Sequence, residues 1–329
     1  MVTRTTAPGL HRILLEDGSL VVHADADGEA QLRHWLPRLP GSPTAASGGV
    51  RASIDLRVVD GAPDAPNPPL SPPALALGPL RAWLSEAPAG AVFHARDQTV
   101  VGVIDFSRLR AEIGVSRAVA ATERPHPGVY SALTLSAALL LNRMRRALLH
   151  GAAVAAPDGR AWLLVGDAFA GKTTTTVNLI AAGWAYLSDD HVVLGRGADG
   201  LPSVEGWPRA FHLDRGYRSG VPTGEREAVD PSDFGADRWR RSAPIAGVFF
   251  PTVIADEPTR IAPIAPADAL ARLIRQSPWL LADRSVAGDV LALLSDIASR
   301  PAFALRLGRD CYRDPDRLLA VLATATNPT

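Results

Sequence analysis

The stretch that decides the fold is Gly166-Asp167-Ala168-Phe169-Ala170-Gly171-Lys172-Thr173, which fits the pattern of a glycine, four residues and then Gly-Lys-Ser/Thr. The two glycines let the backbone approach an anion closely, so successive N–H groups can point at phosphate oxygens. Lys172 supplies a compact charge for the β and γ phosphates, and the Thr173 hydroxyl is suited to magnesium. The sequence therefore predicts a nucleotide-binding loop over residues 166–174, with Thr174 included.

The flanking residues support a strand before this loop and a helix after it. Apolar runs at 148–155 and 161–165 are joined by the turn sequence Ala156-Pro157-Asp158-Gly159-Arg160, which predicts an antiparallel pair of strands. With the turn centred between Asp158 and Gly159, His150 lies beside Asp167. A helix is expected over 172–181, closed by Gly183, with its positive N-terminal end facing the same anion. The alternative is an ordinary glycine-rich turn between a strand and a helix.

Composition narrows the class of protein. The 329-residue chain has 34 basic and 34 acidic side chains, and this balance is not the signature of a nucleic-acid binder. Lys172 is the single lysine, which indicates a position that needs a compact ammonium group rather than a forked guanidinium. Cys311 is the single cysteine, so an intramolecular disulfide and a cysteine-based zinc cluster are excluded.

The start of the chain does not resemble a secretion signal, and the longest apolar stretch, 131–141, is too short to span a bilayer. We expect a cytoplasmic protein without a nucleic-acid or membrane partner.

A pair of carboxylates follows the loop by one helix and one strand. The strand expected over 184–188 ends in Asp189 and Asp190, and more strand is expected over 192–194. A carboxylate pair at this place can hold magnesium, directly or through water, or remove a proton from an attacking hydroxyl. The alternative is a solvated acidic turn.

The chain is expected to form two domains. Residues 1–126 are predicted to be a smaller, β-rich N-terminal domain, with a hairpin around Glu16-Asp17-Gly18-Ser19 and strands at 91–94 and 100–104. Seven prolines between 61 and 79 predict an extended surface connection. Residues 127–329 are predicted to be an α/β domain that begins with a helix over 128–148. Further along, strands are expected at 244–251 and 302–307, and helices at 267–275, 287–299 and 315–324. The polar stretch 215–241 is either a mobile loop that recognises an acceptor over the active site or a plain solvated loop.

His150-Gly151, the loop from Gly166 to Thr173 and Asp189-Asp190 together resemble the catalytic domain of the HPr kinase/phosphorylase family. The order of these motifs and the interval from the loop lysine to the aspartates are similar. The resemblance covers about residues 127–329. It implies a P-loop catalytic domain with a mixed sheet, related in fold to phosphoenolpyruvate carboxykinase, and a homo-oligomer. It also implies transfer of the γ-phosphoryl group of ATP, or GTP, to a hydroxyl such as that of serine, with magnesium.

The resemblance also assigns roles to residues. Lys172 and the backbone of 166–174 would hold the phosphates, Thr173 and Asp189 would bind the metal, and one of Asp189 and Asp190 would act as the general base, with Asp190 favoured. His150 would lie near the γ-phosphate and the aspartates; the alternative is a histidine satisfied within a strand. Glu205 is a candidate for a second carboxylate on the metal. Arg209 is either a contact to phosphate or substrate or a surface residue.

The sequence departs from the family in two places. It lacks the Leu-Glu-Ile-Arg-Gly type of signature downstream of the aspartates, and its N-terminal part does not resemble the family's N-terminal domain. The carrier protein HPr is therefore not the expected substrate. The chain is more similar to divergent members, some of which are associated with the maturation of ribosomal peptides, and the acceptor hydroxyl belongs to a peptide, a protein or a small molecule. The alternative function is a nucleotide-binding regulatory or scaffold ATPase without a phosphoryl acceptor.

Overall fold

A computed structural model describes residues 10–13, 15, 19–36, 49–64, 66–86, 89–122, 124–207, 209–217, 219, 221, 223–234, 238–254, 256–280, 282–312 and 314–326. The predicted hairpin turn at residues 16–18 lies outside this set. The described part of the chain is mixed α/β, as expected. None of its helices is long and apolar enough to cross a lipid bilayer.

The chain divides into two compact units. Among the described residues, the first unit holds those up to Met144 together with 282–287, and the second holds 145–280 and 288–326. Helix α3 (Pro127–Arg143), which we expected at the start of the second domain, belongs to the first unit. Almost all of its residues from Ala132 onward are buried, and it packs on strands of the first sheet. The division therefore falls after Met144 rather than after residue 126.

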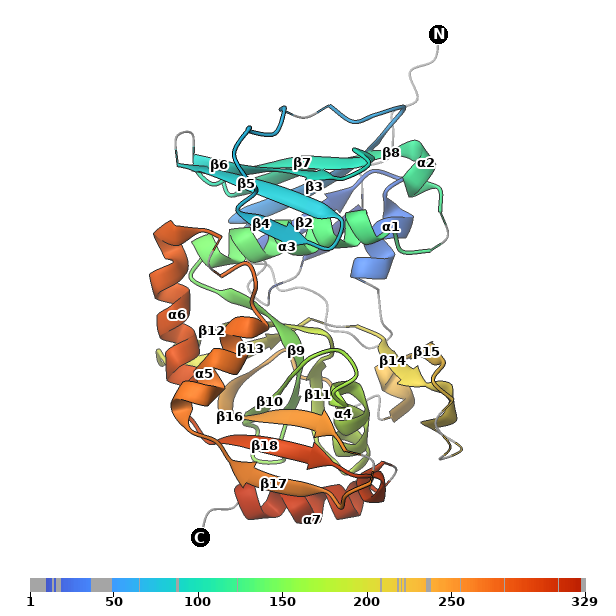
Figure 1. The fold of residues 1–329 in the computed structure, drawn as a ribbon, viewed down its shortest axis with the longest axis vertical. Coiled ribbons are helices and arrows are strands. Elements are labelled where there is room, and N and C mark those ends of the chain that lie inside the picture. The colour runs from blue at the N-terminus through green and yellow to red at the C-terminus, as the bar shows by residue number, and fades with distance from the viewer. Residues whose placement is uncertain are drawn as a thin grey trace. The chain divides into compact units, whose positions relative to one another are not determined.

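The first unit is built on one eight-stranded sheet with the strand order β1-β2-β3-β8-β7-β6-β5-β4 (Figure 1). Its strands are β1 (Leu10–Ile13), β2 (Leu20–Ala24), β3 (Ala52–Val59), β4 (Leu75–Leu77), β5 (Leu80–Glu86), β6 (Ala89–Ala95), β7 (Val100–Asp105) and β8 (Arg110–Ser116). Its helices are α1 (Glu29–Trp35), α2 (Arg117–Ala120) and α3. The proline-rich stretch is anchored along the sheet, because the carbonyls of Pro66 and Ser71 accept hydrogen bonds from His94 Nε2 and Trp83 Nε1.

The predicted helix over 128–148 is too long. The structure ends this helix at Arg143, turns at Arg145 with φ of 58°, and begins strand β9 (Ala147–Ala155) shortly afterwards. Leu148 and Leu149 are buried as strand residues, paired with Val193 and Val192. Apolar spacing misled the prediction because a fully buried strand and a buried helix both present runs of leucine and alanine.

The second unit has its strands in the order β10-β9-β12-β13-β16-β18-β17, with β11 paired to β9 and an additional pairing of β10 with β16. The strands are β9, β10 (Ala161–Val165), β11 (Ala185–Ser188), β12 (His191–Arg196), β13 (Pro202–Gly206), β16 (Ser242–Val253), β17 (Arg260–Pro263) and β18 (Ala302–Leu307). The helices are α4 (Lys172–Ala181), α5 (Pro266–Arg275), α6 (Arg284–Ala298) and α7 (Pro315–Thr326), and a separate hairpin is formed by β14 (Phe211–Asp214) and β15 (Arg226–Val229). Strands β10, β16 and β18 are parallel, so their C-terminal ends lie at one edge, where the glycine-rich loop 166–173 begins.

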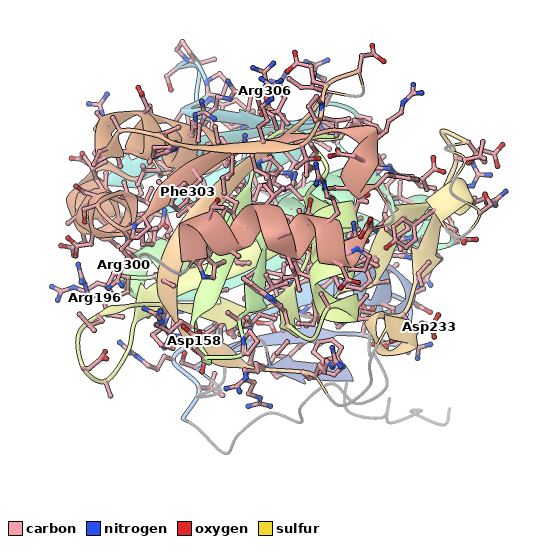
Figure 2. All side chains as sticks on the ribbon, turned by 90° about the horizontal axis from the view of Figure 1, so that it is seen from below. Asp158, Arg196, Asp233, Arg300, Phe303 and Arg306 are labelled. Carbon is pink, nitrogen blue, oxygen red and sulfur yellow. The ribbon has the colours of Figure 1, made fainter. Side chains whose placement is uncertain are left out.

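Two cores hold this unit together. Alternate residues of β10 face opposite sides: Leu163 packs into the core lined by α5 and α6, and Leu164 into the core lined by α4 and α7. Burial on both faces explains why β10 reads as a continuous apolar run. In the second core Phe303 packs against the stacked rings of Trp162 and Phe249. Charged side chains such as Arg196 and Arg306 point outward (Figure 2).

The turn between β9 and β10 sets the register that carries His150 to the loop. Ala156 and Arg160 pair by backbone hydrogen bonding, and Gly159 takes a left-handed conformation with φ of 84°. The turn therefore contains three residues rather than the two assumed from the sequence, which is a common hairpin form with a glycine in that position. As a result Val165 pairs with Gly151, and His150 stands one place further on, beside Gly166 instead of Asp167.

Candidate active site

The lysine of the loop lies in the middle of the site. Lys172 Nζ donates hydrogen bonds to the carbonyl oxygens of Gly166 (2.8 Å) and Asp167 (3.0 Å) and lies 3.2 Å from His150 Nε2. Gly171 has φ of 95°, a conformation that favours glycine, and a Cβ there would meet Leu307 at 2.7 Å. Burial, the largest influence, lowers the pKa of Lys172 from its usual value. The ammonium group of Lys172 is thus held by backbone carbonyls of its own loop.

His150 connects the lysine to the carboxylates. Its Nδ1 lies 3.3 Å from Asp190 Oδ1, and its ring lies 5.8 Å from the ring of His191. Burial and the nearby Lys172 lower the pKa of His150 to about 4, so the imidazole is neutral at pH 7. The partners assign the tautomer: Nδ1–H donates to Asp190, and Nε2 accepts from Lys172.

Asp189 is buried beneath the start of helix α4. Its Oδ2 accepts a hydrogen bond from the Thr173 hydroxyl at 2.8 Å, whereas its buried Oδ1 has no hydrogen-bond partner among the described residues. Burial raises the pKa of Asp189 to about 6, and the neighbouring Asp190 adds to that effect. A buried carboxylate oxygen without a partner is costly, which points to a ligand that the described residues do not supply.

Asp190 is held in a different environment although it is the next residue. Its Oδ2 lies 3.1 Å from His191 Nδ1 and 3.3 Å from a guanidinium nitrogen of Arg209. Burial alone would raise its pKa, but His191, Arg209 and His150 together hold the pKa well below its ordinary value. Asp190 also has φ of 72°, which is uncommon outside glycine and is often found at functional sites. The two carboxylates therefore differ in character, because the pKa of Asp189 is raised and the pKa of Asp190 is lowered.

Three further side chains reach this site from the sequence that follows. Arg209 is only 6% exposed, so the surface interpretation of this residue is wrong. His212 and Arg226 come from the two strands of the β14–β15 hairpin and line the same cavity as the aspartates. Part of the stretch 215–241 is thus an ordered hairpin beside the site. His212 and Arg226 have no fixed spacing from the loop, so no local pattern could have indicated these two residues.

Three cavities border the loop 166–173. The first, here named the carboxylate cavity, has a volume of about 300 Å³ and is lined by His150, residues 168–169, residues 171–174, Asp189, Asp190, His212, Asp214, Gly224, Arg226 and Val253. The second, the apolar cavity, has about 650 Å³ and is lined by Gly171, Thr174, Thr175, Asn178, Asp214, Val221, Val253, residues 307–309, Cys311 and Tyr312. The third, the arginine cavity, has about 510 Å³ and is lined by residues 165–170, residues 250–253, Arg272, Arg275 and Gln276.

Glu205 is not brought to this site. It lies on β13, is paired with Arg146, and does not line the carboxylate cavity. Among the described residues no group of three or more His, Cys, Asp or Glu side chains is arranged to hold a metal ion. Thr173 and Asp189 do fit one hard cation, because they offer a hydroxyl and an unsatisfied carboxylate oxygen side by side, and magnesium bound with phosphates needs only one or two protein ligands.

The arrangement brings together the parts that phosphoryl transfer requires. A loop of backbone N–H groups and an ammonium group can hold an anion, a carboxylate beside a hydroxyl can hold a cation, and a second, ionised carboxylate faces the same cavity. Of the residues singled out in the sequence, Lys172, Thr173, Thr174, Asp189, Asp190 and His150 all line the carboxylate cavity.

Comparison with known proteins adds little to this geometry. No family model matches the chain, and no curated protein matches it. Among solved structures, the HPr(Ser) kinase/phosphatase from Coxiella burnetii aligns with 53% of this chain and 93% of its own, with 12% sequence identity and a TM-score of 0.30. A similarity at this level carries no argument about activity, which rests on the side chains described above.

Proposed function

We propose that this protein is a kinase that transfers the γ-phosphoryl group of ATP, with magnesium, to a hydroxyl of a peptide, a protein or a small molecule. The observation that carries the proposal is the joint placement of Lys172, Thr173 and Asp190 around one cavity, with His150 linking the first and the last. A protein that only binds a nucleotide needs the first two residues, but it has no use for an ionised carboxylate held beside them.

The nucleotide occupies two of the cavities in this proposal. Its phosphates lie along residues 166–173, at the N-terminus of α4, where backbone N–H groups and the helix dipole favour negative charge. Its nucleoside fits the apolar cavity, which meets the loop at Gly171 and Thr174 and continues along α4 to Asn178. Binding requires Lys172 Nζ to exchange its two backbone carbonyl partners for phosphate oxygens.

Thr173 and Asp189 would hold magnesium. The unpaired Oδ1 of Asp189 supports this role, because a cation there would satisfy a buried atom for which the described residues supply no partner. The ion would supply charge neutralisation for the phosphates. A cation would also favour the ionised form of Asp189, against the effect of burial on its pKa.

Asp190 is the residue proposed to receive the acceptor. The acceptor hydroxyl donates its hydrogen bond to Asp190 and is thereby aimed at the γ-phosphorus. The new oxygen–phosphorus bond forms as the bond from the γ-phosphorus to the bridging oxygen of ADP breaks, and the hydroxyl proton passes to Asp190 and then to solvent. Such a transition state depends mainly on positioning and charge, so a carboxylate of low basicity is sufficient.

Incubation of the full chain with γ-labelled ATP, magnesium and panels of seryl peptides and small hydroxyl compounds tests the proposal. We expect label on an acceptor in the wild type and loss of transfer in Asp190→Asn, with nucleotide binding retained. If label reaches only water, and Asp190→Asn leaves that hydrolysis unaltered, the protein is instead a nucleotide-binding ATPase with a regulatory or scaffold role.

A further inference from the structure

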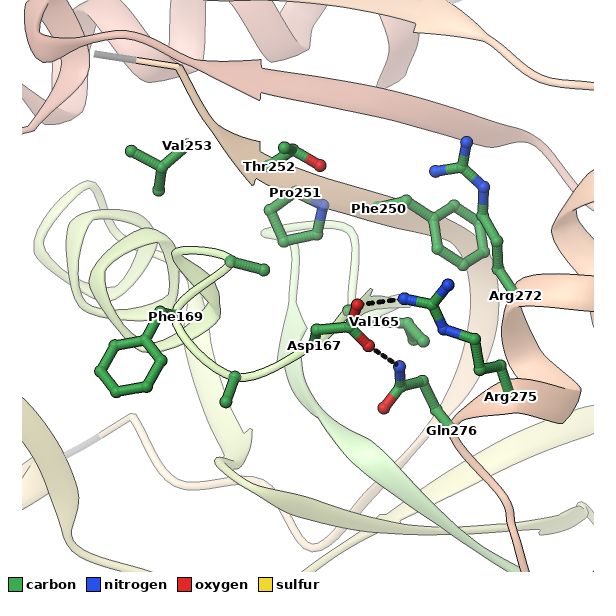
Figure 3. A pocket seen from close by; sticks show the side chains of 13 residues that line it. Val165, Asp167, Phe169, Phe250, Pro251, Thr252, Val253, Arg272, Arg275 and Gln276 are labelled. Carbon is green, nitrogen blue, oxygen red and sulfur yellow. Dashed lines mark hydrogen bonds and ion pairs between the residues drawn. The ribbon is translucent and has the colours of Figure 1, made fainter.

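The arginine cavity borders the same loop as the proposed nucleotide site, and its side chains from α5 have no part in the proposed nucleotide binding. It lies between the loop, the end of β16 and the last turn of α5 (Figure 3), and it shares Ala168, Phe169 and Val253 with the carboxylate cavity. The apolar cavity instead meets the loop at its other end, at Gly171 and Thr174. The two larger cavities therefore lie at opposite ends of the loop.

The end of the loop at the arginine cavity is the end where transfer would take place. The lysine of such a loop reaches the β and γ phosphates, and Lys172 Nζ is bonded to the carbonyls of Gly166 and Asp167 at the beginning of the loop. With the nucleoside beside Gly171, the γ-phosphate is directed toward Gly166. An acceptor that comes from the arginine cavity reaches the carboxylate cavity, and with it Asp190, past the shared residues Ala168 and Phe169.

The cavity carries one uncompensated positive charge. Arg275 is paired with Asp167, whose other oxygen accepts a 2.7 Å hydrogen bond from Gln276 Nε2 (Figure 3). Arg272 forms no ion pair with any carboxylate that the structure describes, and its guanidinium group lies 5.3 Å from the centre of the Phe250 ring. An aromatic ring beneath a guanidinium restrains its plane while leaving its N–H groups available.

The lining also defines the kind of ligand. Phe250 lies next to the guanidinium group of Arg272, and Pro251 and Val165 add apolar surface to the same cavity. A guanidinium group binds a carboxylate through two parallel hydrogen bonds. One uncompensated charge matches a carboxylate, with its single negative charge, better than it matches a phosphate, with nearly two.

We propose that the arginine cavity is the acceptor subsite, in which Arg272 binds a carboxylate of the molecule whose hydroxyl is to be phosphorylated. The approach of the acceptor depends on the proposed kinase function, whereas binding of a carboxylate at Arg272 does not. The carboxylate belongs either to a small hydroxy acid or to an acidic side chain near a serine in a peptide, and two arms of one experiment separate these sources.

The experiment compares ligands that differ only in charge. N-acetylserine is paired with N-acetylserinamide, and the tripeptide acetyl-Glu-Ser-Glu-amide with acetyl-Gln-Ser-Gln-amide. Binding to the full chain is measured by ligand-observed NMR in the presence of magnesium and a non-hydrolysable ATP analogue. We expect the anionic member of one pair to bind about tenfold more tightly than its neutral partner. The pair that shows the preference identifies the source of the carboxylate.

The readout is the ratio of the affinity for the anionic ligand to the affinity for its neutral partner. A general loss of binding would lower both affinities alike and would leave this ratio unchanged. Arg272→Gln is expected to reduce the ratio to about one. Arg260→Gln, which removes an arginine on β17 outside all three cavities, is the matched control and is expected to keep the ratio. The subsite is overturned if both wild-type ratios are near one, if the ratio survives in Arg272→Gln, or if it is lost in Arg260→Gln.

Failure of this inference can be told apart from failure of the kinase. A charge preference that depends on Arg272, found without label transfer to any hydroxyl, retains the subsite and overturns the kinase. Equal label transfer to the charged and neutral members retains the kinase and overturns the subsite.

Discussion

His150 Nε2 lies 3.2 Å from Lys172 Nζ, and the other nitrogen of the same ring lies 3.3 Å from Asp190 Oδ1. One neutral imidazole thus joins the lysine proposed to bind phosphate to the carboxylate proposed to orient the acceptor. The link is possible because β9 pairs with β10 on one side and with β12 on the other, so that His150 faces both the loop and His191. Its position is a consequence of sheet register.

His150→Ala should therefore impair transfer more than nucleotide binding. Loss of the imidazole frees both Lys172 and Asp190 to move, and misplacement by about 1 Å costs roughly a hundredfold in rate. We expect kcat to fall by about that factor while the KM for ATP changes little, measured with labelled ATP and an accepted hydroxyl. Phe303→Leu, in the core away from the loop, serves as a control for general loss of packing. Unchanged kcat in His150→Ala would contradict the linking role.

Lys172→Arg should strongly reduce transfer although it conserves net charge. The single nitrogen of the ammonium group contacts two carbonyl oxygens and one imidazole nitrogen. A planar guanidinium group is larger and spreads its donors over three nitrogens, so it cannot make the same three contacts in this space. We expect a loss of roughly 10²- to 10³-fold in kcat, as for removal of a preorganised donor. The measurement is label transfer at saturating ATP. Retained activity would show that the single lysine was misinterpreted.

The sequence was sufficient for the parts of the site that are contiguous. The loop and the aspartate pair were predictable because each is a short run at the end of an element, and helix α4 and strand β10 have the predicted bounds. Arg226 and Gln276 were not, since each lies far from the loop in sequence, Arg226 on β15 and Gln276 at the end of α5. Their placement depends on tertiary structure alone.

The fold was less predictable where an element is buried on all sides, because its apolar residues then show no periodic spacing. The C-terminal end of α3 and the register of β9 were each misjudged, the first by an apolar run that continues into a strand and the second by a turn of three residues rather than two. The β14–β15 hairpin was not expected because its strands are short and β15 is largely exposed, so neither shows a clear alternation.

Asp189→Asn should stabilise the fold at neutral pH while abolishing activity. The pKa of Asp189 is about 6 in the folded protein, against 3.8 for an unperturbed aspartate, so the folded state binds this proton more tightly and the charged form destabilises it above pH 6. This destabilisation is relieved as the pH falls from 7 to 4. We expect asparagine to raise Tm at pH 7, by an amount corresponding to at most about 3 kcal/mol, and the gain to vanish near pH 4.

Asp190→Asn is the matched comparison, and its effect should have the opposite sign. The pKa of Asp190 in the folded protein lies well below the ordinary value of 3.8. Ionisation of Asp190 therefore stabilises the fold fully above pH 3.8, and this contribution is lost only as the pH falls toward the lower, folded pKa. Asparagine should lower Tm at pH 7. Thermal unfolding of both variants between pH 4 and pH 8 checks the pair, and shifts of the same sign would refute the assigned difference between the carboxylates.

The hydrogen bond from Gln276 to Asp167 should control the shape of the loop. The side-chain amide of Gln276 donates a hydrogen bond to Asp167, and the backbone carbonyl of Gln276 accepts one from the backbone N–H of His150 at 3.0 Å. One residue therefore holds both the loop and strand β9. Gln276→Glu places two carboxylates in contact and should raise the dissociation constant of a fluorescent ATP analogue about tenfold. The exchange Asp167→Asn with Gln276→Glu restores a donor and an acceptor, and we expect it to recover most of that affinity. If the double variant binds no better than Gln276→Glu alone, the contact does not position the loop.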